Sequence, residues 1–362
     1  MGIAVAATVV LFAVWWTTFW PPLGSIAPPT NAEGSGYILP KLVLGLALAV
    51  LLWEGRGYLP GAPGATDEAR VIPPRPGRPA GAGLPRGEGS RVKGYLSIRP
   101  VGARSAVRLY SCFLLAGISR TLRPGRFRGP YLYGTSPAVI ASGGLRFEIR
   151  PRSEDLHYTL PDHKPAVRRH FAPRAGETVV EVGAHVGFYA IRAGACGARV
   201  LAIEPNPATA RQLRTNARLN GLHDFEVLNV ALADREGTGT LYVPRLRDGR
   251  ASLIRGAAAD GADPGLAEVA VTVETLDRVV LPRGETTVDW LLIDTEGAEV
   301  AVLTGGPRTL ERTTHLLLEV SEGTSEACRR LLDARGFEIV SEERQTRFTS
   351  YLVARRPPVR DR

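Results

Sequence analysis

Glycines and acidic residues gather where two predicted strands end. The first strand, 178–182, contains Glu181 and continues through Gly183-Ala-His-Val-Gly187 directly into a helix. Glycines let the backbone approach a ligand closely, and the N-terminus of a helix offers free amides to a carboxylate or a phosphate. The second strand ends at Glu204, 21 residues after Gly183, where a carboxylate can accept both hydroxyls of a ribose. Together these features predict a site for a nucleotide-like cofactor.

The elements that must carry these residues alternate strand and helix from residue 138 onward. This pattern is typical of an α/β fold with a doubly wound, Rossmann-like sheet, in which ligands bind at the carboxyl ends of the strands. Core strands are predicted at 178–182, 199–203, 226–230, 288–293 and 314–320, and a closing antiparallel hairpin at 336–341 and 348–354. Helices are predicted at 186–195, 207–220, 297–303 and 324–335. An inserted pair of strands is predicted at 238–244 and 269–277, with an Ala/Gly-rich loop at 248–268.

The chemistry of the turn favours a cationic cofactor over a dinucleotide. A dinucleotide fingerprint requires G-x-G-x-x-G, whereas Gly183 and Gly187 stand four residues apart with no glycine between them. Glu181 would repel a phosphate, but it would attract the sulfonium and amino groups of S-adenosylmethionine (SAM).

These residues resemble the FkbM-type family of SAM-dependent methyltransferases. The resemblance rests on VVEVGAHVGFYA, AIEPNP with RTNARLNGL, NVALADREGTGTLYV, VETLD and VDWLLIDTEGAEVAVLTGG, which follow one another over about residues 145–320. It implies a seven-stranded methyltransferase sheet and SAM as the cofactor. The contacts with SAM that it implies are a methionine-side turn of Gly183, Ala184, His185 and Gly187, the amino-acid moiety at Glu181, the ribose at Glu204, and the adenine beside Asn206 and Ala231.

Two residues depart from the family pattern. His185 stands where the family usually has Asn, and Leu292 stands where a lysine commonly precedes Ile-Asp. The first is expected to change a contact at the turn. The second removes a cation from the region that handles the substrate.

Acidic residues after the fourth and fifth core strands suit methyl transfer to a hydroxyl. That reaction needs in-line alignment with the sulfonium and, for an unactivated alcohol, a base that takes the proton. Asp294 and Glu296 are predicted to be catalytic, and Glu299 and Glu319 to bind the substrate. The alternatives are that Asp294 or Glu296 only caps the next helix, and that Glu319 is simply solvated.

Metal and nucleophile chemistry are not indicated by the remaining residues. Asp294-Thr-Glu296 resembles a metal-binding pair of acids, but no third hard ligand can be named, so no metal site is predicted. The other histidines show no ligand or triad spacing, and the three cysteines show no CxxC, which favours structural roles and a reducing compartment.

The net charge of +9 over 362 residues is local. Residues 54–150 carry 16 basic and 5 acidic side chains, whereas residues 151–362 carry 28 and 30. The C-terminal part therefore offers no basic face to phosphates, and nucleic acid is not expected as a partner.

Two apolar runs near the N-terminus predict a transmembrane hairpin. Residues 3–20 are uncharged, and 18 residues of helix cover about 27 Å, close to the hydrocarbon thickness. The second run, 37–53, is interrupted only by Pro40 and Lys41. Basic residues follow this run but are absent from the loop before it, so the positive-inside bias places the catalytic domain in the cytoplasm, at the cell membrane. A single span, a signal peptide or two buried helices are the alternatives.

The segments after the hairpin differ in amino-acid composition. Residues 54–95 are rich in Pro, Gly and Arg and predict an extended linker. Residues 96–137 form a basic helical segment that either packs on the methyltransferase domain, residues 138–356, or lies on anionic lipid. Packing is the favoured reading, and the apolar positions at helical spacing are Val107, Tyr110, Leu114 and Ile118.

The resulting hypothesis is a membrane-tethered SAM-dependent methyltransferase that modifies an oxygen of a carbohydrate, a glycolipid or a similar hydroxyl acceptor. The acceptor class follows from the resemblance alone. Two alternatives stay open: a SAM-binding membrane protein without turnover, because of Leu292, and a glycosyltransferase acting on lipid, which would leave the turn after Glu181 without a role.

Overall fold

The computed structural model describes residues 97–122, 136–161, 163–244, 248–258, 265–284, 287–346 and 348–357. The predicted hairpin (3–20 and 37–53) and the predicted linker (54–95) lie outside these residues. Within the described ranges, no helix combines the length and the apolar character needed to cross a bilayer.

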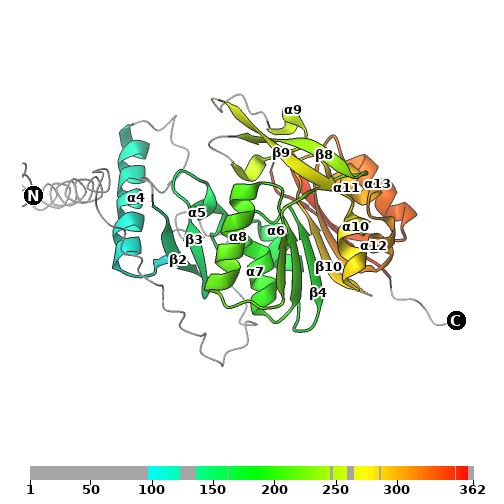
Figure 1. Ribbon diagram of the computed structural model, residues 1–362, viewed down its shortest axis with the longest axis horizontal. Coiled ribbons are helices and arrows are strands. Elements are labelled where there is room, and N and C mark those ends of the chain that lie inside the picture. The colour runs from blue at the N-terminus through cyan, green and yellow to red at the C-terminus, as the bar shows by residue number, and fades with distance from the viewer. Residues whose placement is uncertain are drawn as a thin grey trace, which may run out of the picture. The chain divides into compact units, whose positions relative to one another are not determined.

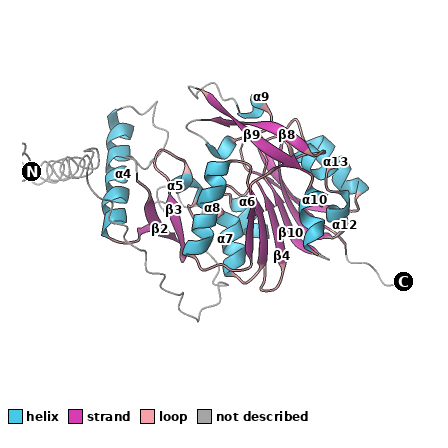
Figure 2. Cartoon of the chain, in the orientation of Figure 1, coloured by secondary structure: helices cyan, strands magenta, loops and turns pink. Residues whose placement is uncertain are grey.

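A seven-stranded sheet forms the centre of the predicted α/β domain (Figure 2). Five strands run parallel, and the strand next to the outer edge runs antiparallel to both of its neighbours. Along the sheet the order is β12 (Glu338–Arg344), β13 (Thr349–Arg355), β11 (Thr313–Ser321), β10 (Val288–Ile293), β4 (Thr178–Val182), β5 (Arg199–Ile203) and β6 (Phe225–Leu228). The predicted α/β sheet and its closing antiparallel hairpin are confirmed, and β6 ends two residues before the predicted boundary.

Alternate residues of the central strands enter two separate hydrophobic cores. Val179 of β4 packs on the side of α7 (Phe188–Ala195) and α8 (Pro207–Leu219), whereas Val180 and Val182 face the opposite layer. That layer consists of α10 (Leu276–Val280), α11 (Glu299–Thr304), α12 (Pro307–Glu311) and α13 (Ser325–Ala334). Successive side chains of a strand point to opposite faces, so strands covered on both sides read as apolar runs. Figure 1 shows the two helical layers on either side of the sheet.

A small sheet precedes the central one and was not predicted. It pairs β1 (Arg99–Pro100) with a hairpin of β2 (Ala138–Ser142) and β3 (Leu145–Ile149). Two asparagines of α8 dock this hairpin, because Asn216 Oδ1 accepts from Glu148 N (2.8 Å) and Asn220 Oδ1 accepts from Arg146 N (2.9 Å). The hairpin thereby covers the helix that follows Glu204.

Helix α4 (Ala103–Leu122) confirms the predicted helix, but Val107 and Tyr110, the two positions of the predicted stripe whose side chains the structure describes, do not pack on the domain. Leu109 and Cys112 are buried, while Val107 is 40% and Tyr110 is 59% exposed. A polar contact fixes this orientation, since Val139 N of β2 donates to Ser105 Oγ at 3.0 Å. The apolar positions Val107 and Tyr110 therefore face away from the domain.

A third sheet lies beyond the carboxyl end of β5. It contains β7 (Ala231–Leu232), β9 (Leu266–Glu274) and β8 (Gly237–Pro244), with β8 and β9 antiparallel. The inserted pair of strands is confirmed. The prediction of a plain loop over 248–268 is wrong in part, because a 3-10 turn at Asp248–Arg250, helix α9 (Arg255–Ala258) and the start of β9 occupy it. Ser252 bridges this insertion to β8 through backbone bonds with Tyr242, which explains the local order.

Candidate active site

A pocket opens at the carboxyl ends of β4, β5 and β10, below the third sheet. Leu241, Ser252 and Leu253 of the insertion form part of its wall. Of the residues predicted from the sequence, those on the pocket wall are Gly183, His185, Glu204, Ala231, Asp294 and Glu296. Those that lie behind the wall are Glu181, Ala184, Gly187, Asn206, Glu299 and Glu319. The predicted edge of the sheet is therefore where the structure brings the acids together.

The turn after β4 depends on its first glycine. Gly183 has a φ of +83°, and a Cβ at this position would overlap the backbone carbonyl of Asp294. The amides of Gly183 and Ala184 both donate to Ile203 O, at 2.9 and 3.0 Å. The turn is thus locked onto the ends of β5 and β10, and it places the backbone of the cofactor turn directly against the predicted base.

Glu204 is buried immediately after β5. Its Oε2 accepts from His185 N and its Oε1 accepts from Asn206 N, both at 2.9 Å. Burial raises the pKa of Glu204, although the nearby His185 charge and these two backbone bonds act against the shift. A carboxylate held at both oxygens keeps lone pairs free toward the pocket, as bidentate recognition of a ribose requires.

Glu181 lies within β4, behind the turn, and is 6% exposed. Burial raises its pKa to about 8, and the backbone N–H of Ala190 and the charge of Lys164 only partly oppose this shift. Its Oε2 has no hydrogen-bond partner among the described residues. A buried carboxyl of this kind stays protonated near neutral pH and can ionise when a cationic group approaches.

We expect the stability of the protein to fall as pH rises because of Glu181. Its pKa in the folded state lies above its unfolded value, so the folded protein binds more protons between about pH 4.5 and 8, and unfolding becomes easier across that window. In Glu181→Gln this loss, roughly 3 kcal/mol, should disappear. Urea unfolding at pH 5.5 and 8.5 measures it. Identical pH dependence in both proteins would contradict the assignment.

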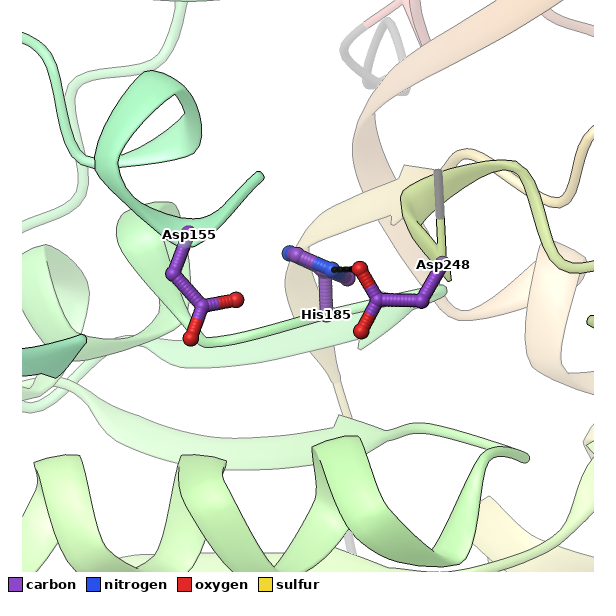
Figure 3. Close-up of side chains that lie close together, drawn as sticks. All are labelled: Asp155, His185 and Asp248. Atoms are coloured by element: carbon purple, nitrogen blue, oxygen red, sulfur yellow. Dashed lines mark ion pairs between the residues drawn. The ribbon is translucent and has the colours of Figure 1, made fainter. Parts of the chain in front are cut away.

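His185 connects the turn to the insertion (Figure 3). Its φ is +49°, its ring lies against that of Tyr158 in a tilted arrangement with 4.4 Å between the centroids, and its Nε2 lies 3.7 Å from Asp248 Oδ1, an ion-pair distance. Burial acts to lower the pKa of His185, but the charge of Asp248 outweighs burial and the pKa is raised. The unusual residue at this position therefore pairs with an acid of the inserted loop.

The same group of side chains contains the one cluster of metal-type donors found in the described part of the chain. Donor atoms of Asp155, His185 and Asp248 all lie within 4.8 Å of one another. Arg150 already binds both carboxylates, with its Nη2 at 2.6 Å from Asp155 Oδ1 and at 2.6 Å from Asp248 Oδ2. Because the guanidinium of Arg150 neutralises these acids, the cluster fits a structural role: it joins the 3-10 turn that contains Asp248 to the turn that contains His185.

Asp294 follows β10 and meets a cation from another element. Lys164, at the start of α6 (Pro165–His170), donates to Asp294 Oδ2 and to Glu319 Oε2, the latter at 2.9 Å. Tyr351 of β13 donates to Glu319 Oε2 at 2.8 Å. Leu292 is packed in the core, so the cation missing at that position is supplied from Lys164.

The other predicted acids divide between the pocket and the helix ends. Glu296 has a φ of +51° and lines the pocket, and burial raises its pKa to about 7. Glu299 accepts from Gly297 N (2.7 Å) and Thr295 Oγ1 (3.2 Å) and thus stabilises the turn before α11. Asn206 caps α8 by accepting from Ala208 N at 3.1 Å. Glu299, predicted to bind the substrate, therefore holds the turn before α11, whereas Asp294 and Glu296 line the pocket.

Three residues of the site were not identified from the sequence: Lys164, Tyr351 and Asp248. Each reaches the site from an element far along the chain, so no local spacing indicates it. The one available signal was composition, because Lys164 is the only lysine after residue 93 in a chain rich in arginine.

Comparison with known proteins finds a similarity to one family over part of the chain. Residues 181–339 match the family model of the methyltransferase FkbM domain. No curated protein matches the chain.

Similar solved structures include three proteins of low sequence identity. Ribosomal protein L11 methylase from Lactobacillus delbrueckii subsp. bulgaricus is 15% identical over 53% of this chain and 76% of that chain, with a TM-score of 0.34. Precorrin-6y C5,15-methyltransferase from Geobacter metallireducens GS-15 is 12% identical over 54% and 87%, with a TM-score of 0.33. M. jannaschii TYW2 in complex with AdoMet is 15% identical over 62% and 87%, with a TM-score of 0.35. Residues 181–339 of this chain are thus similar to a methyltransferase FkbM domain, in agreement with the resemblance drawn from the sequence.

Proposed function

We propose that this protein transfers a methyl group from SAM to a hydroxyl oxygen of a carbohydrate, a glycolipid or a similar acceptor. The observation that carries the proposal is the position of Asp294, which lines the pocket while its backbone abuts the cofactor turn at Gly183. A carboxylate at this place can take a proton from an acceptor hydroxyl held beside the cofactor.

The residues of the pocket have separate tasks in this reaction. SAM supplies an electrophilic methyl group. Glu204 fits the ribose, the turn from Gly183 to Gly187 fits the methionine end, and Ala231 fits the adenine side of the pocket. Asp294 accepts the proton, and Glu296 contacts the acceptor or assists in its deprotonation. Leu241 and Leu253 give the pocket an apolar wall, and polar interactions strengthen where such a wall keeps water away.

The proposed location is the cytoplasmic face of the cell membrane. The apolar runs 3–20 and 37–53 support a tether to the bilayer. The outward-facing Val107 and Tyr110 of α4, together with nearby arginines, support contact between this helix and anionic lipid.

We expect labelled methyl from SAM to enter a component of a membrane extract and to raise the mass of that component by 14 Da. Glu204→Ala should abolish the transfer, because it removes the ribose contact. Glu226→Ala serves as a matched control, since Glu226 lies on the neighbouring strand β6 and pairs with Arg283 outside the pocket.

Two other outcomes would favour the alternatives. Binding of SAM without transfer to any extract component indicates a SAM-binding protein without turnover. Retention on a nucleotide-sugar column, with no heat on titration with SAM, indicates a glycosyltransferase. Either result would overturn the proposed reaction.

A further inference from the structure

A buried lysine stands behind the acids of the pocket. Lys164 has a φ of +46°, and its side chain is 13% exposed. The Tyr189 hydroxyl of α7 contacts the backbone carbonyls before α6, at 2.7 Å from His163 O and 3.1 Å from Lys164 O. The fold therefore holds this lysine in a backbone conformation that L-residues avoid.

The surroundings of Lys164 match an ammonium group. Its Nζ donates to Asp294 Oδ2, to Glu319 Oε2 (2.9 Å) and to Tyr351 OH (2.8 Å). An ammonium has three N–H donors, whereas a guanidinium has five in a planar fork. Only 3 of the 45 basic residues of the chain are lysines: Lys41, Lys93 and Lys164. A lysine therefore occupies this site in a chain in which most basic residues are arginines.

The cluster holds two acids and one cation. The carboxyl groups of Asp294 and Glu319 share two partners: both accept from Lys164 Nζ, and both accept from Tyr351 OH, at 3.4 Å and 2.8 Å respectively. Two neighbouring carboxyl groups tend to share one proton, because the negative charge of one raises the pKa of the other. Burial and the charge of Glu319 raise the pKa of Asp294, whereas Lys164 and the hydrogen bonds outweigh burial and lower the pKa of Glu319. The shared proton therefore resides mainly on Asp294 when the pocket holds no cation.

Asp294 is the member of the cluster that reaches the pocket. Its side chain is 27% exposed, against 15% for Glu319, and Tyr351 is 2% exposed. The other titratable groups facing the cluster are Glu296 on the following loop, Glu181 on β4, Tyr158 on α5 (Asp155–Tyr158) and Tyr189 on α7. Burial raises the pKa of both tyrosines, so they stay neutral, and changes of charge fall on the carboxyl groups.

We propose that Lys164 is a positioning residue that loosens the one proton shared by Asp294 and Glu319, and that a cation entering the pocket expels this proton and leaves Asp294 ionised. The inference rests on the proposed methyl transfer and adds how its base is switched on. The sulfonium of SAM is such a cation, whereas the product S-adenosylhomocysteine (SAH) lacks that charge. Asp294 would then become a base only while the methyl donor is bound.

The atoms and charges of the reaction balance on this basis. The acceptor O–H bond breaks and its proton moves to Asp294 Oδ2, while an O–C bond forms and the S–C bond breaks to leave SAH. The ionised cluster of Lys164, Asp294 and Glu319 carries a net charge of −1 opposite the sulfonium. Both charges disappear in the same step, and the cluster returns to its one-proton state.

Calorimetric titration of the full chain with SAM and with SAH, at pH 7 in buffers of low and high ionisation enthalpy, counts the protons released on binding. We expect SAM to release about one proton more than SAH. The difference should vanish in Lys164→Met, because two acids without the ammonium hold their proton more tightly. The difference in proton release should also vanish in Glu319→Gln, because Asp294 beside Lys164 is then ionised before SAM binds. For the same reason, the pH profile of methyl transfer by Glu319→Gln should extend to lower pH. Glu343→Gln, on β12 beside Arg169 and His170, is the matched control and should keep the full difference.

Other outcomes separate this inference from the proposed function. Equal proton release for SAM and SAH in the wild-type chain overturns the inference and leaves methyl transfer standing, and so does an undiminished difference in Glu319→Gln. These comparisons need no Lys164 variant, so they decide the question even where Lys164→Met does not fold. Absence of binding for both ligands overturns the proposed function together with the inference.

Discussion

Glu204→Ala is expected to weaken binding of SAM and SAH by about 100- to 10,000-fold. Two charge-assisted hydrogen bonds from ribose hydroxyls to the carboxylate would be lost, each worth about 1.5–3 kcal/mol, and about 1.4 kcal/mol corresponds to a factor of ten. The substitution also frees the amides of His185 and Asn206, which the carboxylate now holds at 2.9 Å. Equilibrium dialysis with labelled SAH measures the loss.

The matched variants identify the cause of this loss. Glu204→Gln keeps the size of the side chain and one acceptor oxygen, so we expect it to fall between the wild-type protein and Glu204→Ala. Glu226→Ala should bind as the wild type does, because Glu226 faces Arg283 outside the pocket. Wild-type affinity in Glu204→Ala would remove this residue from the cofactor site.

Gly183→Ala should lower the melting temperature by about 10 °C or more and abolish cofactor binding. The added Cβ would overlap the carbonyl oxygen of Asp294, and a backbone group at the end of β10 cannot move aside without disturbing the sheet. Overpacking of this kind, with the left-handed backbone, costs about 3–5 kcal/mol. Thermal unfolding followed by circular dichroism is the measurement.

Gly176→Ala supplies the control for Gly183→Ala. Gly176 has the same φ of +83°, but a Cβ there would meet no atom within 4 Å. We therefore expect only the conformational penalty, about 1–2 kcal/mol, and unchanged cofactor binding. If both variants lose the same stability, the close approach of Gly183 to Asp294 is not what makes glycine necessary.

The cofactor side of the pocket could be predicted from the sequence because it is built from local patterns. Gly183, Glu204 and Asp294 each follow a strand directly, and the parallel order of β4, β5 and β10 brings these strand ends to one edge. Glycine at a strand-to-helix turn and an acid at the next strand end are signals that act within a few residues. The predicted boundaries of β4, β5 and β10 were confirmed to the residue.

The charge balance of the site could not be predicted because it depends on contacts between distant segments. Lys164 precedes Asp294 by 130 residues, and Tyr351 follows it by 57. Leu292 stands where a cation was expected. No local pattern in the sequence indicates that Lys164, just before α6, places a cation beside Asp294. Glu299 and Asn206 show the reverse case, since a capping residue and a ligand-binding residue have the same sequence pattern at a strand-to-helix junction.

The orientation of α4 shows a further limit of periodicity. Helical spacing groups Val107 with Tyr110, but Leu109 and Cys112 have the same spacing on another side of the helix. The hydrogen bond between Ser105 and β2 decides which side packs, and a pattern based on hydrophobicity does not count such a contact.

Titration of the purified full chain with SAH in a calorimeter, followed by displacement with SAM, tests the central claim most directly. A SAM site that contains Glu204 predicts one binding site per chain, with a dissociation constant of about 1–100 μM. It also predicts competition between the two ligands and loss of the heat in Glu204→Ala. No binding of either ligand at millimolar concentration, or binding that ignores Glu204, would contradict it.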